Sequence, residues 1–575
     1  MKKNKIILSH NSNFKKYENS LFLDEYVQKI FSGFNPRFEK NNFFISIENY
    51  KKKNLYSKLL FKKLKKYRYE LSQFLNKTHN TKNDQKYWGI MLDSFLLFLI
   101  NSIIIDLKFI KRLKNKKKKF FLDQFSFNNF YYSTWDFDSK FWEDNRQAIV
   151  RATIFDAINL SNQKQKKKQS ENFRFVNNLN QKKIFKNIII FFSRFYIKLF
   201  KPILILDGYF GIKTFIKVFL LSFGRVIIIP SGFVFYEKNF NIKINQTVRK
   251  KIKIKEKDLV DKIFNELIGR MLPASFLELF KIYNNNISLS KNIKKLGTAV
   301  SLNCADEFKY LAAEIKKRKG KILHFQHGGI DGDTQKKQIE AIVNRNHSDE
   351  QFFWKESNKK GVNNYLSRFD ETKAINFESN KQILILLTRC LLKQNCSKPS
   401  FLRNHPFLRY SLKFYEKLNS KLKKNSLIRV FPSSKNNHIE EQIIKKIWIN
   451  KFGNNISIDI RNKKILELYY NSKVVILEEI STSFYELLYL NIPFIVIADE
   501  HQFFKKKFSM DYLKLSKVNI IFDKPEEAAK FINKNYNKLD SWWSKVLKDK
   551  SYNDFKKKYL PEKFQTRKFI SEVLS

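Results

Sequence analysis

One short segment combines a residue type that suits proton transfer with glycines that let a ligand approach the backbone. Residues His324 to Gly332 read HFQHGGIDG and directly follow a predicted buried strand. Ligands of open α/β sheets bind beyond the carboxyl ends of strands, so we expect His327 at the mouth of a crevice. Imidazole titrates near neutrality and can accept a proton from a hydroxyl, while Gly328 and Gly329 permit positive φ. A turn with a structural histidine is the alternative.

Carboxylates near this segment offer alternative bases. Asp306 and Glu307 begin a predicted helix, and Asp331 lies in the glycine-rich run itself. The predicted catalytic set is therefore His327, Asp306, Glu307 and Asp331. Gln326, Gly328 and Gly329 are predicted to contact the substrate.

A second segment has hydroxyl groups at a predicted helix start. Residues Val474 to Glu486 read VVILEEISTSFYE, a strand, a short loop and the first turn of a helix. Ser483 and Glu486 have the spacing of a capping box, which predicts a well-capped helix. Hydroxyls and free N–H groups at a helix N-terminus also suit a nucleotide phosphate. The two interpretations are compatible.

A third segment, Ile428 to Lys435, reads IRVFPSSK and again places a polar turn after a strand. Arg429 could bind phosphate with two N–H groups, and the serines of the turn could donate to it. A plain exit from a strand into a turn fits the spacing equally well. The predicted nucleotide-binding set is Thr388, Arg429, Ser433, Ser434, Ser481, Thr482, Ser483 and Glu486.

The elements that carry these residues follow an α/β pattern. Short apolar runs alternate with amphipathic stretches, as in parallel sheets wrapped by helices. Helices are predicted at Lys213–Ser222 and Asp306–Arg318. Strands are predicted at Ile203–Leu206, Val226–Ile229, Ile322–Gln326, Ile383–Leu387, Leu427–Val430, Ile456–Ile460, Val474–Leu477 and Phe494–Ile497. Two doubly wound units result, and a single continuous sheet would contradict this prediction.

The chain divides into a predicted N-terminal domain over residues 1–375 and a C-terminal domain over residues 376–575. The boundary is expected in the polar segment Asp370–Asn380. Lys5–Ser9 is the predicted first strand, and a helical insertion follows over about residues 50–185, with long helices at Tyr50–Lys119 and a polar loop at Ser161–Lys186. The helices from Asp540 onward are predicted to cross back to the N-terminal domain.

Composition excludes a mainly disordered chain, since 575 residues with 43% hydrophobic content can build several cores. The formal net charge is +57. Such a charge favours nucleic acid or an anionic membrane as partner. However, Lys, Asn, Ile and Phe share A/T-only codons, so an AT-rich genome explains much of the excess. Nucleic acid is accordingly not expected, and peripheral contact with an anionic inner membrane surface stays open.

The cysteine residues and the apolar stretches indicate the cellular compartment in which the protein is expected. Cys304, Cys390 and Cys396 have neither an even count nor zinc-ligand spacing, which fits a reducing cytoplasm. The start of the chain lacks the apolar region of a secretory signal. The longest apolar stretch, Ser94–Ile105, is too short to cross a bilayer and is predicted to be a buried helix.

These pieces together resemble a family of transferases encoded in bacterial O-antigen and nonulosonic-acid surface-carbohydrate clusters. The matching segments run nearly end to end, and they include QHGG at Gln326–Gly329 and STSFYE at Ser481–Glu486. More distantly, the chain is similar to capsule Kdo transferases and to GT-B sialyltransferases, which use CMP-activated sugars. Their His-Pro element is replaced here by Phe431-Pro432, whereas the literal His405-Pro406 falls in a predicted helix.

The resemblance implies a GT-B glycosyltransferase with a nucleotide-sugar donor, a CMP-sugar being one candidate, and a glycan or lipid-linked acceptor. The N-terminal domain would hold the acceptor and the base, and the C-terminal domain the donor. No metal or other cofactor is expected. A nucleotide-sugar epimerase of the same fold and a polyanion-binding protein are the alternatives.

Overall fold

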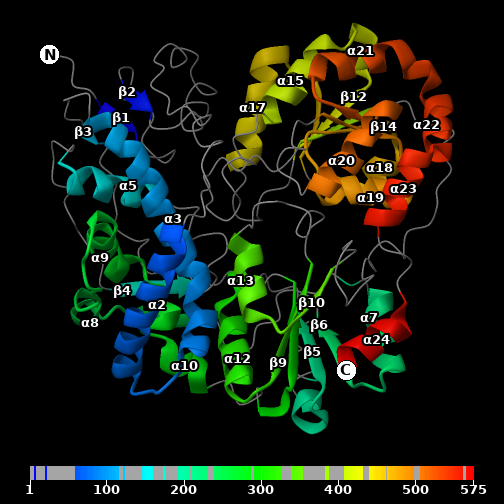
Figure 1. Ribbon diagram of the computed structural model, residues 1–575. Helices are drawn as coiled ribbons and strands as arrows, with labels where there is room; N and C mark the ends of the chain where they lie inside the picture. Colours follow the sequence, from blue (N-terminus) through cyan, green and yellow to red (C-terminus); the bar gives the residue numbers. More distant parts are fainter. Residues whose placement is uncertain are drawn as a thin grey trace.

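The computed structural model describes the chain in separate stretches (Figure 1). The described residues are 5–7, 20–22, 58–114, 121–122, 146–159, 172–176, 192, 195–206, 210, 212–229, 239–285, 291–299, 301–326, 339–353, 382–387, 407–430, 439–460, 463–497, 506–560 and 565–575. Within them two parallel sheets dominate, so the protein is α/β.

The first parallel sheet has five strands in the order β10-β9-β8-β5-β6. Its central strands are buried along almost their whole length, because helices cover both faces of a parallel sheet. The strands are β5 (Ile203–Leu206), β6 (Val226–Ile229), β8 (Lys295–Thr298), β9 (Lys321–Phe325) and β10 (Glu350–Phe352). The accompanying helices are α7 (Ile212–Leu221), α11 (Ser301–Cys304), α12 (Asp306–Lys317) and α13 (Ile339–His347).

The second parallel sheet has six strands in the order β13-β12-β11-β14-β15-β16. The chain enters at β11, moves outward on one side, and then returns to the other side through β14. The strands are β11 (Gln382–Leu386), β12 (Ser426–Arg429), β13 (Ser457–Asp459), β14 (Ser472–Leu477), β15 (Phe494–Ile497) and β16 (Ile521–Phe522). In an open sheet such a reversal of strand order is where ligands bind.

Helices of the second unit complete its two layers. They are α15 (Phe407–Lys417), α16 (Ser420–Lys424), α17 (Ile439–Phe452), α18 (Ile465–Tyr470), α19 (Thr482–Leu490), α20 (Lys506–Lys514), α21 (Pro525–Asn535), α22 (Leu539–Lys548) and α23 (Lys550–Tyr559). One more helix, α24 (Thr566–Leu574), ends the chain. The ranges predicted for strands and helices of both parallel units agree with the structure to within two residues at either end. Strands β8, β10 and β16 were not predicted.

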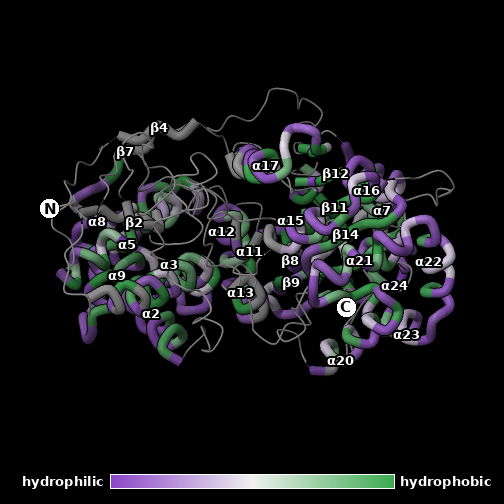
Figure 2. Tube along the Cα trace, turned by 90° about the horizontal axis from the view of Figure 1, so that it is seen from above, coloured by the Kyte–Doolittle hydropathy of each residue, from purple (hydrophilic) through white to green (hydrophobic). Residues whose placement is uncertain are grey.

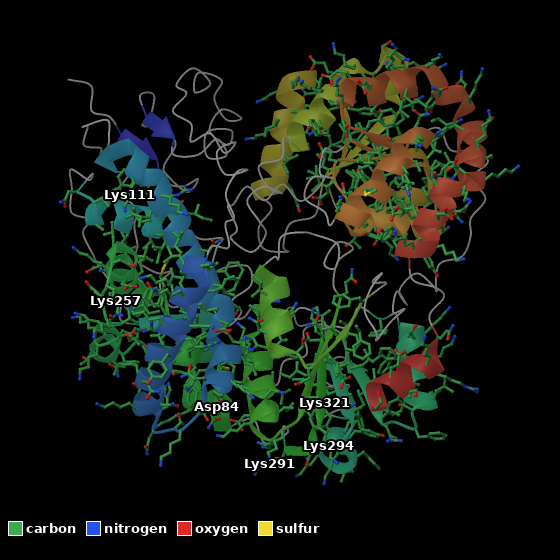
Figure 3. All side chains as sticks on the ribbon, viewed as in Figure 1. Asp84, Lys111, Lys257, Lys291, Lys294 and Lys321 are labelled. Atoms are coloured by element: carbon green, nitrogen blue, oxygen red, sulfur yellow. The ribbon has the colours of Figure 1, made fainter. Side chains whose placement is uncertain are left out.

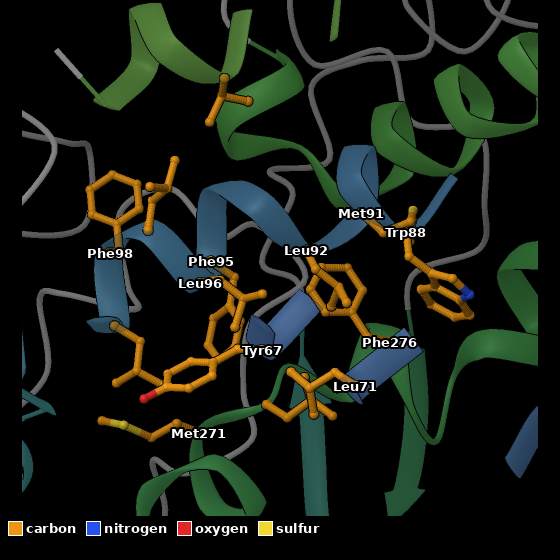
Figure 4. Close-up of a cluster of buried hydrophobic side chains, with 14 of the residues drawn as sticks. Tyr67, Leu71, Trp88, Met91, Leu92, Phe95, Leu96, Phe98, Met271 and Phe276 are labelled. Atoms are coloured by element: carbon orange, nitrogen blue, oxygen red, sulfur yellow. The ribbon is translucent and has the colours of Figure 1, made fainter. Parts of the chain in front are cut away.

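A helical layer lies beside the first sheet. It contains α2 (Lys58–His79), α3 (Gln85–Lys114), α5 (Arg146–Ala157), α8 (Gln246–Lys250), α9 (Leu259–Met271) and α10 (Phe280–Asn285). In Figure 2, α2, α3, α5 and α9 lie side by side, with hydrophobic stretches among them. Figure 4 shows the core they share, where Phe95 of α3 lies close to Tyr67 of α2. The predicted long helices are therefore present and mutually buried.

Helix α3 is the one helix of the described chain that is long and apolar enough to cross a membrane. The apolar part spans Gln85–Lys108, and 94% of its most apolar window is buried inside the protein. Four helices pack on α3: α2 and α5 of the helical layer, and α12 and α13 of the first sheet. The apolar face therefore serves as core, as predicted for Ser94–Ile105.

The last helix, α24, returns to the first sheet and packs beside α7 (Figure 1). Its Phe569 ring lies 6.0 Å from the ring of Phe325 in β9 and 6.3 Å from that of Phe352 in β10. The Lys295 ammonium donates to the Val573 carbonyl at 2.9 Å. Helices α22 and α23, in contrast, pack on the second unit. Of the helices from Asp540 onward that were predicted to cross back to the N-terminal domain, α24 is therefore the one that does so.

Two predictions about the N-terminal half need correction. Residues 5–7 do form a strand, β1, but it pairs with β2 (Ser20–Phe22) and β3 (Phe121–Leu122) in a separate sheet. The predicted loop Ser161–Lys186 contains strand β4 (Asn172–Val176), which pairs with β7 (Asn239–Lys243). Both pairings join segments far apart in sequence, which no local pattern reveals. The predicted boundary Asp370–Asn380 lies outside the described residues.

Candidate functional site

Polar side chains gather where strands β8 and β9 of the first sheet end. Thr298 closes β8 and lies opposite His324 of β9 in the strand register. Both side chains are buried, as is Gln326, which follows β9 directly. The Gln326 N–H donates to the Phe352 carbonyl at 2.8 Å, so the backbone stays in register with β10 up to this residue. The segment that follows therefore leaves the sheet from a fixed point.

Hydrogen bonds hold this strand end to two helices. The Asn344 side chain of α13 lies 2.7 Å from His324 Nε2, and Asn303 of α11 donates to the Asn344 amide oxygen at 2.9 Å. Because the Asn344 NH₂ group can only donate, His324 Nε2 accepts, and the neutral ring carries its proton on Nδ1. Sequence reasoning missed Asn303, Asn344 and His324; the only local signal was their place after apolar runs.

Asp306, one of the predicted alternative bases, is fully buried at the first turn of α12. Its carboxylate accepts from Ser275 Oγ at 2.6 Å and from the buried Lys309 ammonium at 3.1 Å. Burial raises the pKa of Asp306, against the pull of Lys309 and Ser275. A carboxylate enclosed in this way ties α12 to residues 274–276 and does not face solvent, which favours a structural role.

Glu307 stands beside Asp306 but is half-buried, so among the described carboxylates of the predicted catalytic set it is the one nearer to solvent. The rest of that set, His327 and Asp331, lies outside the described residues, as do Gly328 and Gly329. The structure thus places Gln326, Asp306 and Glu307 and leaves the role of His327 as a prediction.

In the second sheet, Arg429 ends β12 and Asp459 ends β13, directly opposite in the register. Both side chains are buried, and the Arg429 Nη1 group donates to Asp459 Oδ2. The Val430 N–H continues the pairing by donating to the Asp459 carbonyl at 3.2 Å. Arg429 therefore has a carboxylate partner that the sequence reading did not foresee. Thr388, Ser433 and Ser434 lie outside the described residues.

The start of α19 follows the carboxyl end of β14. Ser481 is the residue before the first helical turn, and its side chain makes no capping hydrogen bond. Thr482 and Ser483 are the first two helical residues, and all three hydroxyl-bearing residues are half-buried. The N-terminus of a helix also carries unpaired backbone N–H groups and a partial positive charge, so these groups and the three hydroxyls lie in the same turn.

The predicted capping box of Ser483 and Glu486 is wrong. The helix begins two residues earlier than that motif requires, so Ser483 lies inside the first turn. Glu486 is buried, and its carboxylate accepts from the Tyr469 hydroxyl at 2.9 Å. Tyr469 belongs to α18, so Glu486 links two helices.

Another buried carboxylate, Glu478, was missed. It follows β14 directly, three residues before Ser481, and accepts from the Ser411 N–H of α15 at 2.9 Å. The loop between β14 and α19 is thereby anchored at its beginning. An anchored loop holds the helix start in place, which is what binding of a phosphate at that point would require.

Metal sites and cavities are the two other kinds of site that the described residues could form. No group of three or more His, Cys, Asp or Glu side chains there could hold a metal ion. A surface cavity of about 460 Å³ is lined by Lys417, Glu526, Lys530, Asn533 and Lys534. None of the predicted site residues lines this cavity.

Comparison with known proteins decides the class. The sequence pattern of the LIC12162 family transferases matches residues 6–574, nearly the whole chain. The chain belongs to the LIC12162 family of transferases. As a member of this family, the protein is an enzyme. In open α/β sheets, ligands bind beyond the carboxyl ends of the strands.

Solved structures include a distant likeness to this LIC12162 family transferase. The spinosyn rhamnosyltransferase SpnG, solved in complex with spinosyn aglycone, is 12% identical at a TM-score of 0.27, covering 65% of this chain and 96% of its own. The curated proteins give no match.

Proposed function

We propose that this transferase is a glycosyltransferase, which moves a sugar from a nucleotide donor to a surface-polysaccharide or lipid-linked acceptor. Family membership supports group transfer. The two parallel sheets, each with polar residues at its strand ends, support a GT-B arrangement of two Rossmann-like domains. In this arrangement the first sheet serves the acceptor and the second serves the donor.

The observation that carries the donor assignment is the start of α19. Ser481 occupies the N-cap position without using its hydroxyl as a cap, and Thr482 and Ser483 add two more hydroxyls to the same turn. Anions bind at helix N-termini because free N–H groups and the helix dipole favour negative charge. We assign the donor phosphate to this turn, which Glu478 anchors.

His327 is the proposed general base. It follows Gln326 in the sequence, whose backbone pairs with β10, and the network of His324, Asn344 and Asn303 holds the strand end that precedes it. In the reaction His327 accepts the acceptor hydroxyl proton, the hydroxyl oxygen bonds to the anomeric carbon, and the bond from that carbon to the phosphate oxygen breaks. The electron pair leaves with the nucleotide, which the α19 turn stabilises.

The donor is proposed to be a CMP-sugar of the Kdo or nonulosonate kind, and the reaction is proposed to run in the cytoplasm without a metal ion. The CMP-sugar follows from the resemblance to Kdo transferases and GT-B sialyltransferases, and the cytoplasm follows from cysteine usage. Because Phe431-Pro432 replaces the His-Pro element of those CMP-sugar enzymes, the identity of the nucleotide should be tested first.

The deciding experiment has two steps. A thermal-shift screen of CMP, UDP, GDP and their sugar conjugates should give stabilisation by one nucleotide family. The selected donor is then incubated with and without glycan acceptors in the presence of a chelator. Sugar transfer only with acceptor supports the proposal, whereas donor turnover without acceptor identifies an epimerase. Salt-sensitive binding of polyanions with no nucleotide effect identifies a polyanion-binding protein.

A further inference from the structure

Exposed hydrophobic side chains concentrate in one part of the described chain. Eight of the twelve large hydrophobic residues that are exposed lie between residues 192 and 223. Seven of them come from a helix over residues 195–200, from α7 and from the turn after α7, and the eighth, Phe192, precedes that helix in the chain. Soluble proteins scatter such residues singly, and a contiguous set marks an interaction site.

Helix α7 presents two kinds of side chain on its outer face. Lys213, Ile216, Lys217 and Leu220 recur at intervals of three and four residues, so they share that face, and all four are exposed. Its opposite side packs on the sheet through Val218, which is fully buried. The outer face is therefore apolar with cations interspersed.

The helix over residues 195–200 continues this surface. Tyr196 stacks on Phe200 with ring centroids 4.5 Å apart and contacts Phe219 of α7 at 5.7 Å. Its hydroxyl also fills the space beside Gly224, which has a φ of +72°. Tyr196 thus joins the two helices and the turn into one rigid unit.

Phe223 occupies the turn after α7. It is 92% exposed and has a φ of +52°, a conformation that favours glycine or asparagine. The turn holds it there, because its N–H donates to the Leu220 carbonyl at 3.0 Å and the Gly224 N–H donates to the Phe219 carbonyl at 2.8 Å. Neither this backbone conformation nor packing against the described residues favours a phenylalanine at this position.

The charges on this surface are of one sign. Residues 195–206 and 212–229 contain no Asp or Glu, and their exposed cations are Lys198, Lys201, Lys213, Lys217 and Arg225. Further exposed lysines lie nearby where strands of the first sheet begin: Figure 3 shows Lys291 and Lys294 at this end of the molecule, together with Lys321, which is paired with Glu350 at 2.7 Å. A partner for this face must be both apolar and anionic.

We propose that the docking surface, defined as Phe195, Leu199, Phe200, Leu220, Leu221 and Phe223 with their interspersed cations, binds the surface of an anionic lipid bilayer. Protein interfaces are depleted in lysine, whereas helices that lie on membranes combine Phe and Leu with Lys and Arg. Lysine stems can lie along the apolar surface while their ammonium groups reach lipid phosphates. The candidate site lies at the opposite, carboxyl ends of the strands, so docking leaves it open. The proposal does not depend on the reaction assigned above.

The test is co-sedimentation with vesicles of phosphatidylcholine alone and of phosphatidylcholine mixed with phosphatidylglycerol. The wild-type chain should bind the mixed vesicles and lose binding as salt rises. The double variant Leu220→Gln/Phe223→Gln should bind at least about tenfold more weakly, because two apolar side chains no longer enter the interface. Its matched control, Met510→Gln/Leu513→Gln, changes exposed apolar residues of α20 and should bind as wild type.

A second pair of variants tests the cations. Lys198→Gln/Lys201→Gln/Lys217→Gln should weaken binding to mixed vesicles at least about tenfold, since each basic residue near an anionic surface contributes roughly fivefold. Lys545→Gln/Lys548→Gln/Lys550→Gln removes the same charge from α22 and α23 and should have little effect. Circular dichroism checks folding of each variant. Equal binding by both members of either pair overturns the proposal. So does a wild-type dimer in sedimentation velocity that the Leu220/Phe223 variant dissociates, because the surface would then join two copies of the chain.

Discussion

Arg429 and Asp459 form a buried ion pair across the ends of the neighbouring strands β12 and β13. The pair occupies the carboxyl edge of the second sheet, where the donor is proposed to bind. Removing one member of a buried pair leaves an uncompensated charge. Asp459→Leu should therefore destabilise the protein by about 3–5 kcal/mol. Arg429→Met/Asp459→Leu should recover most of this loss, as measured by thermal or urea denaturation.

The same variants separate structure from binding. If Arg429 also contacts the donor phosphate, the stable double variant should still lose nucleotide affinity. Unchanged affinity in that variant would restrict Arg429 to the ion pair.

Thr482 is the second point to test, because it opens α19 beside an N-cap that does not use its hydroxyl. Thr482→Val should weaken nucleotide binding by about tenfold or more, the scale of a hydrogen bond to a charged group. The melting temperature of the free protein should hardly change, and isothermal titration would measure the affinity. Thr566→Val, at the matching first position of α24, serves as control. A Thr482 variant with wild-type affinity would remove the donor from this turn.

Ser483→Ala bears on the corrected helix start. Since Ser483 lies within the first turn and is not the N-cap, its loss should not cost the roughly 1 kcal/mol typical of a lost cap. A drop of that size in the free energy of unfolding would restore the capping box.

His327→Asn should fold and bind donor nearly normally but transfer sugar about 100-fold more slowly or worse, the usual scale for a lost general base. Asparagine keeps similar bulk but cannot accept a proton at neutral pH. Steady-state rates with a saturating donor would measure this. Retained transfer in this variant together with loss in Asp331→Asn would make the base a carboxylate. Activity in both variants would place the catalytic site elsewhere.

Asp511 of α20 predicts a dependence of stability on pH. Burial alone would raise its pKa, but hydrogen bonds from Lys558, Lys514 and Tyr559 outweigh this and lower the pKa to about 2. A depressed carboxyl pKa contributes stability that is present above the unfolded value of 3.8 and is lost as pH falls toward about 2.

Asp511→Asn should therefore be less stable than wild type by about 2 kcal/mol near pH 6, and the difference should shrink below about pH 3. Melting temperatures of both proteins across this range provide the measurement. Asp554→Asn, an exposed carboxylate of α23, should track wild type throughout. A pH-independent gap between Asp511→Asn and wild type would show that the contribution is not ionic.

The sequence by itself determined the α/β class and the position of most strands. Runs such as Ile203–Leu206 and Phe494–Ile497 are apolar at every position, because both faces of a parallel strand are buried. The amphipathic stretch Asp306–Lys317 likewise specifies a helix on its own. These signals lie within one segment, so no knowledge of the partner segment is needed. Strands β8 and β16 escaped prediction because a glycine, or mere shortness, weakens the same signal.

Tertiary structure decided which polar side chains are available for chemistry. In sequence, Asp306 and Arg429 cannot be distinguished from residues that bind substrate. In the structure, however, Asp306 is hydrogen-bonded to Ser275, and Arg429 is paired with Asp459. Partners drawn from distant segments meet only when the sheet and its helices are assembled, and burial depends on what finally covers each residue. For the same reason the exposure of Phe223 could not be read from its sequence neighbours, which resemble a core strand in composition. Local pattern fixes the elements, whereas the packing of elements fixes the charges and surfaces through which they act.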